Sequence, residues 1–239
     1  MPFWYECNGH RPFERYSLLS AQRLIHVVNL SLLCIILFST PTVFICSRLL
    51  AVAQKVWIAL EASGAPFDTE EVALYGPNGK PDWFWDLNPR GTVPVLVCHG
   101  GAVIYADSDL ALDAIEKGSA MQGMRLNDRV NLEDKKLQQK IQTWRASINA
   151  MLPVGKEAVL GGNKQKLFKM LLEMDGKVVG PYLCGDEVTS ADCAAFPFLW
   201  RLNDEFGLKD YNNLLAWLKH CNNNMAFSKT VRSVWWWWW

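Results

Sequence analysis

Two adjacent residues, Asp107 and Ser108, combine the groups needed to bind a charged small molecule at the start of a helix. They follow a short apolar segment and open the pattern DSDLALDAIE, which predicts a helix. Either side chain can simply cap this helix by accepting backbone N–H bonds. The same geometry can also hold a ligand carboxylate through free N–H groups and the Ser108 hydroxyl, while Asp107 meets an ammonium group. The pair therefore suits a ligand that carries both groups on one carbon, such as an α-amino acid.

Val93-Pro94 lies where the segment TVPVLV enters a predicted strand. Proline interrupts a central hydrogen-bond ladder, so it belongs at the first residue of a strand or at an edge. A cis bond here would turn the backbone N–H and C=O of Val93 outward, free to pair with a peptide-like ligand. An ordinary edge-strand proline explains the same residues, and both interpretations stay open at this point.

The chain has seven Cys and four His, without a Cys-x-x-Cys pair. This pattern fits neither a secreted disulfide framework nor a zinc ribbon, so we expect a reducing, cytoplasmic location and no metal. The 24 basic and 24 acidic side chains sum to zero net charge. Nucleic-acid binders need a basic surplus, so no nucleic-acid partner is expected.

Hydrophobic periodicity places these residues on an α/β unit. The predicted elements are a helix over 51–63, a strand over 67–74, a loop over 75–80, an irregular segment over 81–91, an apolar strand over 93–98, a turn over 99–101, a strand over 102–105 and a helix over 107–116. Their order indicates an α/β N-terminal domain of thioredoxin-like size.

The second half of the chain predicts helices only, over 128–151, 164–173, 190–206 and 213–224. The charge changes at the same place, because residues 1–118 hold 8 basic and 12 acidic side chains and the rest hold 16 and 12. We place the domain boundary at 117–124, between an α/β domain over 53–118 and an all-α domain over 124–230. In the latter, Thr189 at the N-cap and Asp192 at N3 predict a capping box, which is a folding signal.

Both ends of the chain depart from this organisation. Residues 27–47 contain no charged side chain and are long enough to cross a membrane, but Pro41 and several polar residues interrupt them. A membrane segment and a buried strand with neighbouring core are both open for this run. The last five residues, 235–239, are all Trp. We assign residues 1–52 to an irregular segment with a candidate first strand, and 231–239 to a low-complexity tail.

Together these motifs resemble the cytosolic glutathione transferases. The segments that carry the resemblance are KPDWFWDLNPRGTVPVLV, IYADSDLALDAIE, GPYLCGDEVTSADCAAFPFLWRL and NLLAWLKH. They are most similar to the cysteine-type members, which are the omega class with the lambda transferases and dehydroascorbate reductases nearby. The resemblance covers residues 53–230 and implies a thioredoxin-like domain followed by an all-α domain, the glutathione transferase fold.

The resemblance also implies glutathione as the cosubstrate and a role for each of several residues. Val93, before the expected cis Pro94, would bond the cysteinyl backbone of glutathione. Asp107 and Ser108 would hold its γ-glutamyl end, and Lys80 would reach its glycyl carboxylate. Family members carry a cysteine at the start of the first helix, where the helix dipole lowers the pKa of the thiol. The thiolate exchanges with glutathione disulfides.

The chain departs from the family at this cysteine. Aligning residues 53–57 with the family's helix puts Leu50 at the nucleophile position and Ala51 in place of proline. The nearest thiol, Cys46, lies one helical turn earlier and could serve only if the helix began a turn sooner. Its apolar neighbours favour a buried, structural cysteine.

Residues 15–19 resemble the family's first strand, which should lead within a few residues into the catalytic cysteine. Unmatched, mostly apolar residues fill the chain from there to the helix instead. We therefore hypothesise that residues 21–52 are translated non-coding sequence that replaced the catalytic loop.

The function expected from the resemblance is that of a glutathione-binding transferase, thiol transferase or glutathione-dependent reductase, inactive if the missing cysteine is decisive. Its second substrate would be a small electrophile or an oxidant such as dehydroascorbate. One alternative is a non-catalytic scaffold that keeps the glutathione pocket. Another is a membrane-associating protein similar to the chloride intracellular channels, in single-pass or peripheral contact through 27–47. The family is usually dimeric, so a homodimer is the expected assembly.

Overall fold

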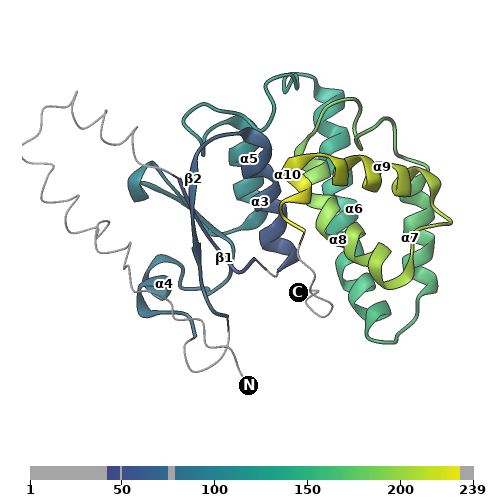
Figure 1. The fold of residues 1–239 in the computed structure, drawn as a ribbon, viewed down its shortest axis with the longest axis horizontal. Helices are drawn as coiled ribbons and strands as arrows, with labels where there is room; N and C mark the ends of the chain where they lie inside the picture. The colour runs from purple at the N-terminus through teal and green to yellow at the C-terminus, as the bar shows by residue number, and fades with distance from the viewer. Residues whose placement is uncertain (1–41, 49, 75–78, 232–239) are drawn as a thin grey trace, which may run out of the picture.

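The computed structural model describes residues 42–48, 50–74 and 79–231. Its N-terminal part is built on a four-stranded mixed sheet in the order β2-β1-β3-β4 (Figure 1). The strands are β1 (Thr42–Cys46), β2 (Phe67–Glu71), β3 (Val95–Cys98) and β4 (Val103–Tyr105). β1 is parallel to β2, and β3 is antiparallel to both β1 and β4. The parallel pair requires a crossover, which the helix between β1 and β2 supplies.

Strand β1 lies inside the uncharged run of the sequence. Phe44 and Cys46 belong to the main core, whereas Ile45 belongs to a smaller cluster on the opposite face of the sheet. The buried-strand interpretation is therefore confirmed for 42–46, while residues 27–41 lie outside the described residues. No helix within the described ranges is long and apolar enough to span a membrane.

The same strand shows what the described part of residues 21–52 forms. β1 sits centrally in the sheet, between β2 and β3, and leads directly into the first described helix. The strand that we placed at residues 15–19 lies outside the described residues, and the sheet of the α/β domain already includes Thr42. We therefore propose that this domain begins at residue 42 rather than at residue 53. The hypothesis that residues 21–52 are translated non-coding sequence stays a prediction.

Helices cover both faces of the sheet. α3 (Ala51–Ser63) and α5 (Ser108–Lys117) pack on the face that turns toward the helical domain, and α4 (Asp82–Leu87) packs on the other (Figure 1). We expected an irregular segment at 81–91. A short helix forms there because Phe84 fits, fully buried, into the small cluster with Ile45 and Val95.

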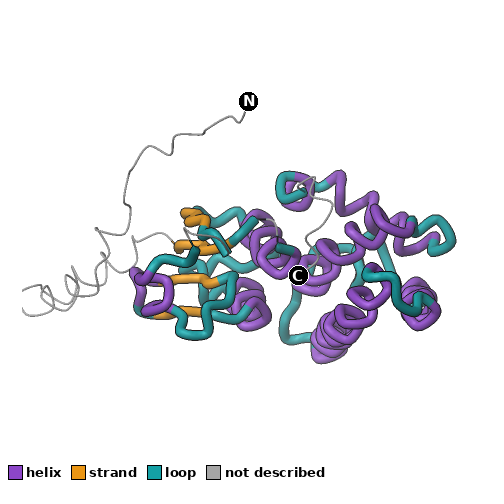
Figure 2. Tube along the Cα trace, turned by 90° about the horizontal axis from the view of Figure 1, so that it is seen from below, coloured by secondary structure: helices purple, strands orange, loops and turns teal. Residues whose placement is uncertain are grey.

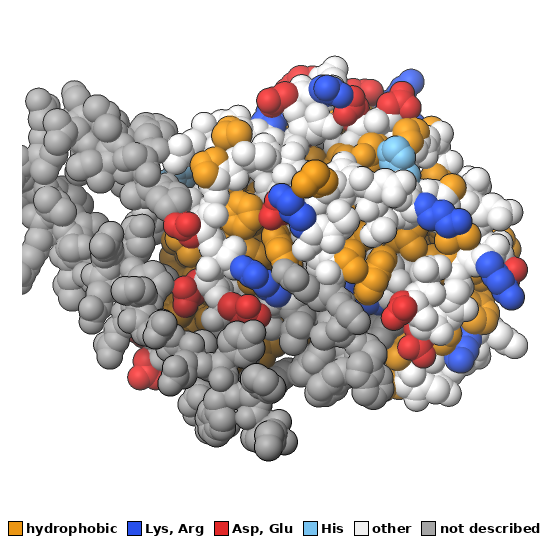
Figure 3. Space-filling model, in the orientation of Figure 1, with side chains coloured by type: hydrophobic (Ala, Val, Ile, Leu, Met, Phe, Trp, Pro, Cys, Tyr) orange, Lys and Arg blue, Asp and Glu red, His pale blue; other side chains and the backbone are white. Residues whose placement is uncertain are grey.

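The rest of the chain is helical, as expected. Its helices are α6 (Lys135–Val159), α7 (Gln165–Asp175), α8 (Ser190–Phe206), α9 (Asn212–Asn223) and α10 (Met225–Ser228). The buried helix α8 packs against both α3 and α6 and so joins the two domains. In Figure 2 the strands lie together at one side of the molecule, with the helical domain beyond α3 and α5. On the face in Figure 3, acidic and basic side chains are interspersed rather than gathered by sign.

Helix α6 differs most from its predicted bounds. It begins at Lys135 rather than at 128, because the Asp134 carboxylate accepts the backbone N–H groups of Lys136 and Leu137 as an N-cap. It also continues through Pro153 to Val159, where proline predicted a stop. Tertiary packing of Met151 and Val154, both buried, outweighs the lost backbone hydrogen bond.

The predicted capping box at the start of α8 is confirmed. The Asp192 carboxylate is fully buried and accepts four hydrogen bonds. The donors are the backbone N–H of Leu183 at 2.8 Å, the backbone N–H of Thr189 at 2.9 Å, the Thr189 hydroxyl at 3.0 Å and the Trp217 indole at 2.9 Å. Asp192 therefore ties α9 and the segment before α8 to the start of α8.

Candidate functional site

The register of the sheet brings three of the predicted positions to one end. Ile45 pairs with Val95, and Leu96 pairs with Tyr105. Because β3 runs antiparallel to both neighbours, the chain leaves β1, enters β3 and leaves β4 at the same end of the sheet. The start of α3, the Val93-Pro94 bond and the start of α5 follow directly at that end. This end of the sheet is the candidate site.

Leu50 is the N-cap residue of α3 and is almost completely buried. Its backbone is extended, with φ −82° and ψ 133°, and no side chain caps the helix. The first turn of α3 also holds no acidic residue. The positive end of the helix dipole is therefore left without a protein carboxylate at the position where the family carries its nucleophile.

Cys46 ends β1 and is fully buried. Burial raises the pKa of its thiol to about 12, and Glu71 acts in the same direction, against the opposing effect of Arg48. Helix α3 begins at Ala51, so the earlier start that a nucleophilic role would need is not present. The Cys46 position matches the buried, structural interpretation, since a thiol of this kind is protonated at neutral pH.

The other described cysteines share this environment. Burial raises the pKa of Cys98 to about 11 and of Cys184 to about 12, and it raises the pKa values of Cys193 and Cys221 as well. All of them are buried and unpaired by disulfides. Within the described ranges, no thiol has the lowered pKa of a thiolate nucleophile. No group of three or more His, Cys, Asp or Glu side chains there could hold a metal ion.

The bond between Val93 and Pro94 is cis, as the sequence indicated. Pro94 is buried directly before β3, whereas Val93 is half-buried. Among the described residues, the backbone N–H and C=O of Val93 make no hydrogen bond. They are thus available for a ligand with a peptide-like backbone.

Asp107 is the N-cap residue of α5. Its Oδ1 accepts the backbone N–H of Asp109 at 2.8 Å and that of Leu110 at 3.1 Å. The plain capping role that we left open is therefore present. The other carboxylate oxygen of Asp107 and the hydroxyl of Ser108 have no hydrogen-bond partner in the part of the chain that the structure describes. Capping uses half of the Asp107 carboxylate and leaves the rest for a ligand.

Lys80 precedes α4, with its ammonium group 5.5 Å from the centre of the Trp85 ring. The loop after α4 is held firmly, because Nδ2 of the buried Asn88 donates to the Thr92 carbonyl at 2.7 Å. Arg90 then donates to the Ala106 carbonyl at 3.0 Å, which ties this loop to the segment just before α5. The Arg90 contact was not anticipated from the sequence.

A charged cluster behind the start of α5 was also missed. The Asp109 carboxylate receives Lys55 of α3 at 2.8 Å and Arg145 of α6 at 3.3 Å. Arg145 also pairs with Asp113, and Asn149 donates to Asp109 at 3.3 Å. Lys55 and Arg145 are buried. The only sequence signal was the i,i+4 spacing of Asp109 and Asp113 on one predicted helix.

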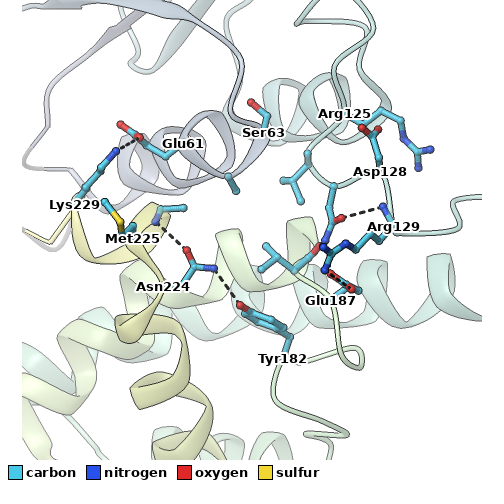
Figure 4. Close-up of a pocket in the computed structure, with 15 residues that line it drawn as sticks. Glu61, Ser63, Arg125, Asp128, Arg129, Tyr182, Glu187, Asn224, Met225 and Lys229 are labelled. Carbon is cyan, nitrogen blue, oxygen red and sulfur yellow. Dashed lines mark hydrogen bonds and ion pairs between the residues drawn. The ribbon is translucent and has the colours of Figure 1, made fainter.

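A cavity of about 630 Å³ lies elsewhere (Figure 4). It is lined by the C-terminal turn of α3, residues 125–129, residues near 182–188 and the start of α10. Four of its six charged side chains form two ion pairs, Lys229 with Glu61 at 3.2 Å and Arg129 with Glu187 at 3.5 Å. Leu50 lies at the opposite end of α3, so this cavity is separate from the candidate site.

A thioredoxin-like sheet domain, a cis proline before its third strand and an all-helical second domain define the glutathione transferase fold. Two family descriptions match the chain: "Glutathione S-transferase, N-terminal domain" over residues 51–117, and "Glutathione S-transferase, C-terminal domain" over residues 141–220. Together they cover more than half of the chain, which belongs to the glutathione S-transferase family.

Individual relatives are distant. Glutathione S-transferase DHAR2 of Arabidopsis thaliana is 28% identical over 67% of this chain and 70% of its own length. Glutathione S-transferase AN1595 of Emericella nidulans is 25% identical over 58% of this chain and 55% of its own length. Glutathione S-transferase omega-1 of Sus scrofa is 27% identical over 63% of this chain and 62% of its own length. The chain thus spans between about half and seven tenths of these relatives.

Solved structures agree on the fold. Glutathione transferase Omega 3C from Trametes versicolor superposes with a TM-score of 0.68 at 20% identity, over 91% of this chain and 96% of that protein. Rice GST1, solved in complex with glutathione, also superposes with a TM-score of 0.68. It is 19% identical over 81% of this chain and 91% of that protein. The expected fold class is therefore confirmed. Sequence identities this low do not show which class of glutathione transferase the chain belongs to or which substrate it uses.

Proposed function

We propose that this protein binds glutathione at the sheet end that carries Leu50, Val93-Pro94 and Asp107-Ser108. The observation that supports it most is the set of polar groups left unsatisfied there. The Val93 backbone suits the cysteinyl peptide unit, and the free Asp107 oxygen and the Ser108 hydroxyl suit the ammonium and carboxylate of the γ-glutamyl end. Lys80 would reach the glycyl carboxylate by swinging off the Trp85 ring.

The chemistry that we propose is glutathione transfer with the thiol of glutathione as the nucleophile. A ligand held as described carries its sulfur toward the start of α3, whose dipole would stabilise a thiolate. The absence of an acidic residue in the first turn of α3 supports this role. Thiol exchange through a protein cysteine, as in dehydroascorbate reductases, finds less support because Leu50 replaces the nucleophile and Cys46 is buried.

A non-catalytic glutathione-binding protein is the second candidate. It is favoured by the same Leu50, which fills the position next to the expected sulfur with an apolar side chain. A membrane-associating role has no support among the described residues. A cytoplasmic location and a homodimer remain part of the proposal on the strength of the family alone.

Calorimetric titration of the full chain with glutathione tests the binding. Conjugation of a model electrophile and glutathione-dependent reduction of dehydroascorbate then separate the candidates. We expect binding, measurable conjugation and little reduction, with Cys46→Ala behaving as wild type. Leu50→Cys should raise the reductase rate at least about tenfold, because it places a thiol at a helix N-terminus. Absence of glutathione binding would overturn the proposal, and binding with neither activity would select the non-catalytic candidate.

A further inference from the structure

A second cavity, of about 570 Å³, lies wholly within the helical domain. One wall is a face of α6, and the other is the segment that follows α7. The lining residues are Lys136, Gln139, Lys140, Thr143, Trp144, Gly176, Lys177 and Val179. The lining contains none of the positions of the proposed glutathione site and no carboxylate.

The three lysines of this cavity are not neutralised by the protein. Lys136 and Lys140 are one helical turn apart on α6, and Lys177 approaches from the opposite wall. None of their ammonium groups forms an ion pair or hydrogen bond with any described residue.

The nearest carboxylates in the sequence are engaged elsewhere. Asp134 caps α6, and Asp175 accepts the backbone N–H of Leu214 at 2.8 Å and the amide of Asn213 at 3.3 Å. Positive charge therefore accumulates in this cavity, because no carboxylate is among its lining residues.

Trp144 contributes one further donor, whose nitrogen keeps contact with solvent. Its side chain is 5% exposed, yet its indole N–H donates no hydrogen bond within the described residues. The nitrogen is also not among the polar atoms sealed from solvent. A buried indole usually finds an acceptor. Since Trp144 lines the cavity, an acceptor placed there would satisfy it.

Hydrogen-bond donors thus dominate the polar lining. Ammonium and indole groups can only donate, and the Thr143 hydroxyl already donates to the Gln139 carbonyl at 2.7 Å. The ring of Trp144 and the exposed Val179 add apolar surface beside them. This arrangement contrasts with the larger cavity of Figure 4, where four of the six charged side chains form ion pairs.

We propose that this cavity is a binding site for a small organic phosphate. A phosphate monoester carries about two negative charges and three acceptor oxygens, which matches three ammonium groups and one indole donor. The organic part would lie against Trp144 and Val179. The site does not depend on the proposed glutathione site, so either proposal can fail without the other.

Nuclear magnetic resonance of the full, ¹⁵N-labelled chain reports on the indole directly. The Trp144 indole signal is assigned by its loss in Trp144→Phe, and the protein is titrated with phenyl phosphate, inorganic phosphate, phenol and glutathione. We expect phenyl phosphate to move this signal saturably and more tightly than inorganic phosphate, and phenol and glutathione to leave it in place. An unmoved signal with phenyl phosphate would overturn the proposal, as would an equal response to phenol or to glutathione.

A pair of charge-matched variants tests specificity by calorimetry. Lys140→Gln removes one cation of the cavity, whereas Lys169→Gln removes an exposed cation on α7 outside the lining. Lys140→Gln should weaken phenyl phosphate binding about tenfold, which corresponds to one charge-assisted hydrogen bond, and Lys169→Gln by no more than about twofold. Equal effects of the two variants would show non-specific attraction and contradict the site.

Discussion

An aspartate accepts backbone N–H groups at the start of α5 and at the start of α8, but the two starts leave different groups unsatisfied. Asp107 is the N-cap residue of α5, and Asp192 is the third residue of α8, behind the N-cap Thr189. Asp192 is fully buried, and four donors within the protein saturate it. Asp107 is half-buried, and only one of its oxygens is used among the described residues. Asp192 therefore serves folding, and Asp107 has capacity left for a ligand.

This difference follows from where each helix starts. α8 begins inside the helical domain, where its backbone N–H groups need acceptors within the protein. Asp192 accepts that of Thr189 and Glu116 accepts that of Ser190, although the buried Ser190 hydroxyl has no partner among the described residues. α5 begins at an end of the sheet, where the chain also turns at Pro94 and at Leu50. Three breaks in regular structure at one sheet end leave backbone and side-chain groups without partners. A ligand can then supply what the fold does not.

The largest effect is expected at Asp192. Asp192→Ala leaves two backbone N–H groups, a hydroxyl and an indole buried without an acceptor, and should lower the free energy of unfolding by about 3 to 5 kcal/mol. Urea denaturation followed by circular dichroism measures the loss. Asp192→Asn, which keeps part of the acceptor capacity, should lose clearly less. Equal stability of Asp192→Ala and wild type would show that Asp192 does not hold α8 and α9 together.

A smaller effect is expected at the charged cluster around Asp109, which links α5 to α3 and to α6. Arg145→Met leaves Asp109 and Asp113 without their shared cation, and should lower the free energy of unfolding by about 2 kcal/mol. The loss is below that of a sealed ion pair because both carboxylates retain contact with water. Arg129→Met is the matched control, since its surface pair with Glu187 should contribute less than about 0.5 kcal/mol. Denaturation midpoints that fall equally in both variants would contradict this role.

Variants of Asp107 test whether the start of α5, unlike the start of α8, binds a ligand. Asp107→Ala should cost about 1 kcal/mol of stability, as for other helix caps, but weaken glutathione binding at least about tenfold. Asp107→Asn, which can still cap, should restore most of the stability and little of the affinity, because it lacks the charge that meets an ammonium group. Calorimetric titration at equal folded fraction measures both. If Asp107→Asn binds glutathione as wild type does, Asp107 is a cap and nothing more.

The sequence was informative where local rules decide the structure. The capping box at Thr189 and Asp192 and the helix at 51–63 depend on a few neighbouring residues, and both were predicted. The cis bond at Pro94 was expected only from the family resemblance, because local residues left an ordinary edge-strand proline open. β1 was not predicted, because an uncharged run of mixed residues looks alike in a membrane helix and in a central strand. A central strand is recognised by its register and its pairing partners, and the residues of the uncharged run do not indicate either of them.

The roles at the candidate site were harder to predict for the same reason. Asp107 and Val93 were identified because motifs surround them. The contacts of Asp109 with Lys55 and Arg145 span 54 and 36 residues, and no local pattern links those positions. The burial of Cys46 was expected from its apolar neighbours, but the effect of Glu71, which acts with burial to raise the pKa of this thiol to about 12, was not.

The smallest expected effect concerns pH. Burial pushes the pKa of Asp109 upward, but Lys55, Arg145 and Asn149 outweigh burial, so its pKa lies below the ordinary 3.8. A carboxyl whose pKa is lower in the folded state stabilises the protein above its unfolded pKa, and this contribution is lost as pH falls through the folded value. Since Asp109 is partly exposed, we expect less than about 1 kcal/mol from it.

Asp109→Asn should therefore lose less stability than wild type when the pH is lowered from about 5 to about 2.5. Urea midpoints at the two pH values give the difference, and Asp128→Asn, an exposed carboxylate outside the cluster, serves as the control. Parallel pH profiles for wild type and Asp109→Asn would show that Lys55 and Arg145 interact with Asp109 too weakly to depress its pKa. The cluster would then hold the start of α5 through its hydrogen bonds to Arg145 and Asn149 rather than through charge. In that case the start of α5 would resemble the start of α8 more closely than the ion pairs suggest, because hydrogen bonds would fix both helices. Only the free oxygen of Asp107 would then distinguish the two starts.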